Sequence, residues 1–242
     1  KTMKTRATRS GKDYLLQGSK TFITNAGEAD LYLVFASTSG GPSAFIVKNH
    51  TEGMSFGEDM PKLGMRGSRT SEVIFRDCRV DGANMVGEEG KGLEYVKQML
   101  NSSRIVMAAI CVGIAQHAYD LAIRYSVDRE ISGKAVSDFQ ITKEKIADMI
   151  TEIGAARHLY FAAARLRDMD SDYSSEAAQA KLFASETSAR VCDRAIQIFG
   201  GYGYTNADVH RHWRDARLLT IGEGTSEILR LLVARKELAK LR

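Results

Sequence analysis

The sequence contains few residues of the kinds that interrupt helices or cross-link chains. Its 242 residues include only two prolines, Pro42 and Pro61, and three cysteines. Cys78, Cys111 and Cys192 are odd in number, far apart and without the spacing of a metal site. We therefore expect reduced thiols that fill the core, as in a protein from a reducing compartment, and no disulfides.

Histidine is also scarce, and its placement does not indicate a metal centre. His50, His117 and His158 are isolated, whereas His210 and His212 form a His-x-His pair with no third ligand at a suitable spacing. We expect these histidines to lie on the surface or in loops, and we expect no metal site.

Long apolar runs and clusters of one charge are missing too. No apolar run approaches the roughly 18 residues that cross a bilayer, so we expect a soluble chain without a membrane span. The net charge of +4 is spread among 30 acidic residues, which does not favour nucleic acid but suits a small anionic ligand. With 44% hydrophobic residues, the chain can form one large or two modest domains.

The first third of the chain predicts a sheet domain. Short β-rich stretches alternate with turn-forming clusters such as residues 25–28 and 39–43. The expected strands cover residues 14–16, 21–24, 31–35, 44–47 and 73–75. We expect a multi-domain α and β protein in which residues 1–86 form a middle, antiparallel β-barrel domain.

The rest of the chain predicts helices, because no proline follows Pro61 and apolar residues recur at spacings of three and four. We expect helices near 90–130, 137–170 and 174–199, and a last one from about 224, packed as a four-helix bundle over residues 87–242. The expected buried positions are Ile146, Met149, Ile150, Ile153 and Tyr160 in the second helix, and Ala180, Ala184, Thr187, Val191, Ala195 and Ile198 in the third.

One acidic residue near the C-terminus lies between two glycines, in the run Ile221-Gly222-Glu223-Gly224. Glycine destabilises a helix by roughly 1 kcal/mol relative to alanine. Two glycines beside one acid therefore indicate that backbone flexibility or access to the carboxylate matters more here than helix stability. Glu223 is therefore our first candidate for a catalytic base. The alternative is a plain helix boundary, in which Gly222 ends one helix, Thr225 or Ser226 caps the next and Glu227 lies in its first turn.

A glycine-rich run, Gln197-Ile198-Phe199-Gly200-Gly201-Tyr202-Gly203-Tyr204, precedes Arg214-Asp215-Ala216-Arg217. It follows a predicted helix rather than a strand, which excludes a Rossmann dinucleotide loop and leaves a helix C-cap with a loop as the alternative. With the Glu223 segment, this ordered set resembles the C-terminal signature of the acyl-CoA dehydrogenase family. The resemblance covers residues 13–241 and lacks the family's N-terminal domain, so we expect a truncated form or one subunit of a split enzyme.

The resemblance implies FAD as the cofactor. Gln197, Gly200 and Gly201 would contact the FAD of a neighbouring subunit, because bare glycine amides can approach a pyrophosphate closely. Arg129 and Gln140 lie in a segment similar to one whose arginine reaches that pyrophosphate. Without the family, Arg129 would be read as a solvated loop charge.

Two further segments receive cofactor roles from the same resemblance. Residues 20–25 resemble a strand in which the aromatic residue, here Phe22, packs on the flavin and the threonine, here Thr24, bonds to flavin N5. The alternative is an ordinary strand. Thr225 and Glu227 are also assigned to the cofactor.

For the substrate, the resemblance assigns Arg104, Gly222 and Gly224. Isovaleryl-type members carry their base one residue before the arginine, but Ser103 occupies that position here, which leaves Glu223 as the base. A glycine at position 222 leaves room for a branched or otherwise bulky acyl group.

The implied reaction desaturates an acyl-CoA thioester to a trans-2-enoyl-CoA. Glu223 would remove the α-proton and flavin N5 would take the β-hydride. The resemblance also implies an electron-transferring flavoprotein as acceptor, a homotetramer built as a dimer of dimers, and a location in the bacterial cytoplasm or mitochondrial matrix. Two alternatives remain: an acyl-CoA oxidase that uses O₂, and a non-catalytic partner subunit whose neighbour supplies flavin and base.

Overall fold

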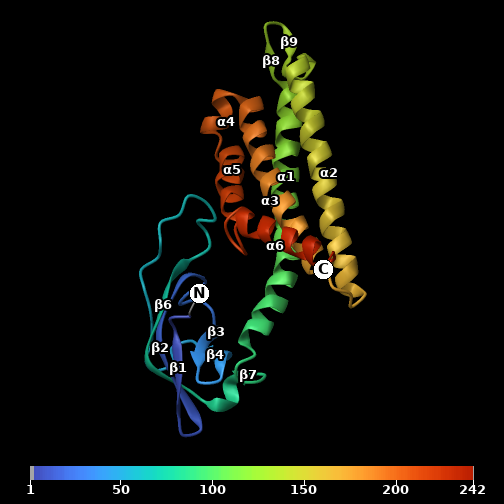
Figure 1. The fold of residues 1–242 in the computed structure, drawn as a ribbon. Coiled ribbons are helices and arrows are strands. Elements are labelled where there is room, and N and C mark those ends of the chain that lie inside the picture. The colour runs from blue at the N-terminus through green and yellow to red at the C-terminus, as the bar shows by residue number, and fades with distance from the viewer. Residues whose placement is uncertain (1–2, 242) are drawn as a thin grey trace. The chain divides into compact units, whose positions relative to one another are not determined.

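The computed structural model describes residues 3–241, which form two compact units (Figure 1). The sheet unit comprises residues 3–62 and 66–99, and the helical unit comprises residues 63–65 and 100–241. Helix α1 (Gly92–Asp128) begins in the first unit and continues into the second. The domain boundary expected after residue 86 stays a prediction.

The sheet unit is built on seven strands in the order β5-β6-β2-β1-β3-β4-β7. These are β1 (Arg6–Ser10), β2 (Asp13–Thr24), β3 (Leu31–Thr38), β4 (Gly41–Lys48), β5 (Met54–Phe56), β6 (Thr70–Val80) and β7 (Met85–Val86), with a 3₁₀ turn η1 (Gly82–Asn84). All five predicted strand segments lie in these strands, although residues 14–16 and 21–24 are parts of one strand, β2.

The prediction of an antiparallel β-barrel is not confirmed. Strands β1 and β3 pair in parallel, so the sheet is mixed. Among the described strands, β5 and β7 are the two ends of the hydrogen-bonded order and do not pair with each other, so the sheet is not closed. Buried side chains alternate along β3, where Tyr32, Val34 and Ala36 are buried.

The helical unit contains three long helices that lie alongside one another (Figure 1), and three shorter ones. After α1 come the hairpin β8 (Glu130–Ile131) and β9 (Lys134–Ala135), η2 (Val136–Asp138), α2 (Gln140–Asp168), α3 (Ser174–Phe199), α4 (Gly201–Thr205), α5 (Ala207–Leu219) and α6 (Ser226–Ala239). Helix α3 is central, because α2, α5 and α6 all pack against it.

The four-helix prediction missed two helices, the short α4 and the longer α5. Most of the stretch between Tyr204 and Arg214 belongs to α5, and both α5 and α6 pack against α3. The signal for α5 lies in Asn206, whose side chain accepts hydrogen bonds from the backbone N–H groups of Asp208 and Val209 and so caps the helix.

The buried faces of the helices follow the predicted spacing with one exception. All six positions predicted for α3, from Ala180 to Ile198, are buried. In α2, Met149 and Ile153 are fully buried, but Ile150 is 40% exposed, so its assignment to the core was wrong. Position 150 lies one residue beyond Met149, about 100° around the helix, which turns its side chain out of the core.

Helix α1 contains an 18-residue stretch that is long and apolar enough to cross a membrane, by length and composition only, so the expectation that no apolar run approaches this length was wrong. This is weak evidence, because core helices of soluble proteins share these properties. Ala108, Ala115 and Ala122 of α1 are buried in the core of the helical unit.

Cys78, Cys111 and Cys192 are free and buried as expected, and burial raises their thiol pKa values to about 11, 12 and 12 respectively.

The expectation of surface or loop histidines was wrong for His212. It lies on α5 with 9% of its surface exposed, and its Nε2 is 2.6 Å from Nδ1 of His117 on α1. His210 contacts the guanidinium group of Arg214. Within residues 3–241, no group of three or more histidine, cysteine or acidic side chains could hold a metal ion.

The core assignment of α2 can be tested with neighbouring residues. Met149→Ala removes a side chain with 0% exposure and should lower the free energy of unfolding by about 2–5 kcal/mol, because it leaves a cavity. Ile150→Ala, on the solvent side, should lower it by less than about 1 kcal/mol. Urea unfolding followed by circular dichroism measures both, and equal losses would contradict this packing.

His212 predicts a pH dependence of stability. Burial lowers its pKa below the ordinary value of 6.5, and His117 lowers it further. The unfolded chain therefore takes up this proton more readily, so the free energy of unfolding should fall as the pH drops below about 6.5. His212→Gln should make that fall shallower in urea unfolding series, whereas His158→Gln, at an exposed position of α2, serves as control. An unchanged slope in the His212 variant would refute the assignment.

Candidate functional site

Glu223 lies in the turn between α5 and α6. Its φ is +58° and that of Gly224 is +104°, so two consecutive residues adopt left-handed backbone conformations. A glutamate in this region is uncommon and is stabilised only by its surroundings. Thr225 caps α6 by accepting a hydrogen bond from the N–H of Ile228 at 3.4 Å. The helix-boundary interpretation is correct for Thr225 as the cap and for Glu227 in the first turn of α6, but Thr220 rather than Gly222 ends α5. The carboxylate of Glu223 lies outside both helices.

Two residues of α1 contact Glu223. Ser103 donates its hydroxyl to Oε2 of Glu223 at 2.6 Å. Arg104, which is only 8% exposed, donates from Nε to the backbone carbonyl of Glu223 at 3.4 Å and from a terminal nitrogen to Oδ1 of Asn101 at 3.1 Å. The structure thus brings Arg104 and Glu223 together, as the sequence resemblance implies, and burial lowers the pKa of Arg104.

A third contact was missed by the sequence analysis. Lys181 of α3 is fully buried and donates from Nζ to the backbone carbonyl of Gly224 at 2.7 Å. Burial lowers the pKa of this ammonium group. A signal was present in the sequence, because Lys181 lies next to Ala180 and three residues before Ala184, on the side of α3 predicted to be buried.

The two glycines beside Glu223 differ in what requires them. Gly224 needs its positive φ, and a Cβ there would lie 3.5 Å from Leu229 and 3.8 Å from Arg104. Gly222 lies outside the left-handed region, and a Cβ there would meet only the carbonyl oxygen of Leu218, at 3.8 Å. Neither backbone strain nor close packing therefore requires a glycine at position 222. The glycine leaves free space beside the carboxylate of Glu223.

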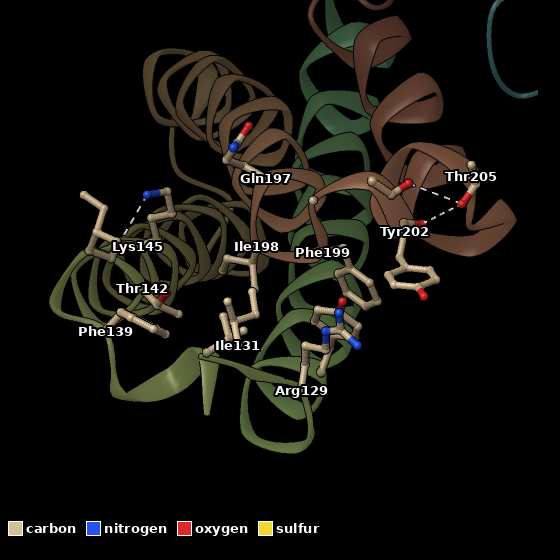
Figure 2. A pocket seen from close by; sticks show the side chains of 15 residues that line it. Arg129, Ile131, Phe139, Thr142, Lys145, Gln197, Ile198, Phe199, Tyr202 and Thr205 are labelled. Carbon is tan, nitrogen blue, oxygen red and sulfur yellow. Dashed lines mark hydrogen bonds between the residues drawn. The ribbon is translucent and has the colours of Figure 1, made fainter. Parts of the chain in front are cut away.

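A cavity of about 630 Å³ lies where α1, the β8–β9 hairpin, α2 and the end of α3 meet (Figure 2). It brings together four of the predicted cofactor residues: Arg129, Gln197, Gly200 and Gly201. Gln140 is not in its lining, although it lies between two residues that are, Phe139 and Ile141.

The cavity combines positive charge with apolar and aromatic walls. The guanidinium carbon of Arg129 lies 5.6 Å from the centre of the Tyr202 ring, and Tyr125 stacks on Phe199 with ring centres 4.1 Å apart (Figure 2). Gly200 has φ +60° and ends α3, so the C-cap interpretation is correct. A Cβ at Gly200 or Gly201 would meet nothing within 4 Å, which leaves the backbone open to a ligand. Such a site suits an anionic ligand with a planar ring.

A second cavity, of about 390 Å³, adjoins the first turn of α6. Thr225 and Glu227, both predicted cofactor contacts, line it together with Arg190 and Arg217. The side-chain hydroxyl of Ser226 is buried there without a hydrogen-bond partner within the described residues. Helix N-termini and arginines both attract anions, so this cavity also suits a phosphate-bearing ligand.

In the sheet unit, Phe22 and Thr24 lie at the exposed end of β2. The pairing of β2 with β6 shifts register between Lys20 and Ile23, and Phe22 within this irregularity has φ +59° and is 76% exposed. A bulky aromatic residue in this conformation is an outlier that marks functional sites more often than ordinary strands. The strand is therefore irregular at this position, and the contact of Phe22 with a flavin stays a prediction.

The acidic residue of the Arg214–Arg217 motif has a structural contact. Asp215 of α5 accepts a hydrogen bond from the backbone N–H of Met65 at 2.5 Å. Gly64 lies against the backbone of Arg214, where a Cβ would collide with the carbonyl group. These contacts hold Gly64 and Met65 on α5.

Comparisons with known proteins agree with these features. Residues 1–78 match the family model described as acyl-CoA dehydrogenase, middle domain, and residues 90–238 match acyl-CoA dehydrogenase, C-terminal domain. The human short-chain specific acyl-CoA dehydrogenase, mitochondrial, is 43% identical over 95% of this chain and 57% of its own length.

Two solved structures share the fold. The butyryl-CoA dehydrogenase of Megasphaera elsdenii has a TM-score of 0.94 and 41% identity, over 99% of this chain and 64% of that one. A structure described as the electron transferring flavoprotein of Acidaminococcus fermentans has a TM-score of 0.96 and 42% identity, over 98% and 64%. The chain therefore spans about three fifths of the length of these relatives. From its two family matches and these relatives, the chain belongs to the acyl-CoA dehydrogenase family.

Proposed function

We propose that the protein desaturates an acyl-CoA thioester between its α and β carbons with FAD as cofactor, and that Glu223 is the base. The observation that carries the proposal is the position of Glu223. Its carboxylate stands outside both helices on a left-handed turn, and a hydroxyl group of α1 holds one of its oxygens. A family member with an anchored carboxylate at this position has the group that α-proton removal requires.

The local contacts suggest how Glu223 works. The hydrogen bond from Ser103 occupies Oε2, whereas Oε1 accepts no hydrogen bond from residues 3–241. We therefore assign proton removal to Oε1. Arg104 and Lys181 bind the backbone of the turn rather than the carboxylate, so they fix its direction without occupying the reactive oxygen.

The residues around the two cavities fit FAD. Arg129 could pair with its pyrophosphate, and the open backbone at Gly200 and Gly201 admits a phosphate without an intervening side chain. Gln197 and Gln140 would complete this site, which is proposed to hold the FAD of a neighbouring subunit. For the FAD of the chain itself, Thr225 and Glu227 are proposed contacts at the smaller cavity, and Phe22 and Thr24 are proposed contacts of the flavin ring in the sheet unit. FAD would supply the acceptor for the β-hydride.

The acyl group is proposed to be short. The relatives named as short-chain specific acyl-CoA dehydrogenase and butyryl-CoA dehydrogenase support this size. Gly222 supports tolerance of a branch, because the structure has open space where a side chain would stand. Arg104 and Gly224 are assigned to the walls of the substrate site.

The partners are proposals as well. We propose a homo-oligomer, a dimer of dimers, in which the cavity at Arg129 serves the FAD of a neighbouring subunit. We also propose an electron-transferring flavoprotein as acceptor. The similarity to the structure described as the electron transferring flavoprotein of A. fermentans supports this class of partner.

Glu223→Gln in the full-length, flavin-loaded protein tests the proposed base. The amide keeps the shape of the side chain but cannot take a proton, so the rate of butyryl-CoA desaturation should fall by about 10²- to 10⁴-fold or more with flavin content unchanged. Loss of flavin absorbance on adding the thioester measures the rate. Glu144→Gln, at an exposed site of α2, is the control.

The same assay separates the alternatives. An undiminished rate in the Glu223 variant would refute the base assignment, and failure of the natural protein to bind flavin would favour a non-catalytic partner subunit. Rapid formation of peroxide in air would identify an oxidase instead of a dehydrogenase.

Gly222 predicts the tolerance for branched chains. Gly222→Ala should fold normally, because the added Cβ meets no close neighbour, whereas Gly222→Tyr should fill the space beside Glu223. We expect the tyrosine variant to lower kcat/KM for a branched short-chain thioester about tenfold or more relative to a straight one. An unchanged ratio of the two kcat/KM values would show that position 222 does not limit the acyl group.

A further inference from the structure

Lys181 is an unusual charged residue, because its exposed fraction is 0%. Burying an ammonium group costs several kcal/mol unless strong interactions compensate for the lost hydration. Its neighbours along α3 make room for it: Ala177, Ala178 and Ala184 are also buried and have no side chain beyond Cβ. A long apolar residue could fill this space without the cost, so the charge itself calls for an explanation.

The bond from Lys181 ends on the turn that carries the proposed base. Its Nζ donates to the carbonyl of Gly224, and Arg104 donates to the preceding carbonyl, that of Glu223. Two buried cations from α3 and α1 thus hold consecutive carbonyl groups. These belong to the two residues with φ of +58° and +104°, a conformation that costs of order 1–3 kcal/mol for the non-glycine residue.

The surrounding charges show that Lys181 does not act as the partner of an ion pair. Within residues 3–241 Lys181 forms no salt bridge, although Cys111, Arg104 and Glu223 are close enough to influence the pKa of its ammonium group. Its single hydrogen bond goes to a backbone carbonyl. A charged donor bonds a carbonyl more strongly than a neutral donor does, so this contact suits the restraint of a strained turn.

We propose that Lys181 is a positioning residue for proton abstraction: by holding the Gly224 carbonyl from inside the bundle, it keeps the Glu223 turn in the conformation that aims the carboxylate at the substrate. The inference rests on the proposed function. It assigns Lys181 no contact with substrate or flavin, so its effect should appear in the proton-transfer step and not in binding.

Lys181→Met tests the proposal, since methionine fills similar space without a donor. In the full-length flavin enzyme with butyryl-CoA, we expect kcat to fall about 10- to 100-fold while KM changes less than about 3-fold. The kinetic isotope effect with α-deuterated butyryl-CoA should increase, because proton transfer becomes more limiting. Flavin content should stay that of the natural enzyme.

Two further variants complete the design. Lys181→Gln keeps a shorter, neutral N–H donor and should give an intermediate kcat, and it replaces the methionine variant if that one does not fold. Lys143→Met, at an exposed position of α2, is the matched control and should leave kcat and the isotope effect unchanged.

The outcomes distinguish the inference from the function on which it rests. If Lys181→Met has the same kcat and isotope effect as the unsubstituted enzyme while Glu223→Gln is inactive, the proposed role of Lys181 is refuted and the proposed function stands. Activity that falls only in proportion to lost flavin would show a purely structural role and would also overturn it. An active Glu223→Gln would refute the proposed function itself.

Discussion

The site depends on one constraint: two consecutive left-handed residues, Glu223 and Gly224, must stay in an unfavourable conformation. A backbone hydrogen bond from the N–H of Ser226 to the carbonyl of Thr220 closes the turn, but Glu223 and Gly224 themselves lie outside α5 and α6. Its carbonyl groups are bound by Arg104 and Lys181, and its carboxylate by Ser103. Because these residues belong to α1 and α3, the position of the carboxylate follows from the packing of the helical unit.

The same unit shows how a helix bundle carries chemistry at its ends. The core of α3 is rich in small residues, which lets α2, α5 and α6 pack against it and gives a rigid scaffold. The groups that we propose to be functional lie where these helices stop: at Gly200, at Glu223 and at Arg129, directly after α1. At such ends the backbone N–H and carbonyl groups are not used within a helix and are available to a ligand or to a buried side chain.

Much of this arrangement could be predicted from local patterns. The long helices, the buried stripe of α3, the strands and the ordered glycine motifs all depend on residues close together in the sequence. The errors arose where tertiary contacts decide. Residue Ile150 fits the apolar spacing but faces solvent, His212 has a polar side chain but is buried against His117, and the β1–β3 pair is parallel because residues far apart in sequence align it.

The sequence by itself determined the family, the two kinds of secondary structure and the choice of Glu223 as the candidate base, because these rest on residue types and their spacing. Only the tertiary structure decided that Ser103 binds the carboxylate, that Gly222 has open space beside it, and that Lys181 reaches the turn from 43 positions away. Such contacts depend on how helices pack, and packing joins residues whose separation along the chain carries no local signal.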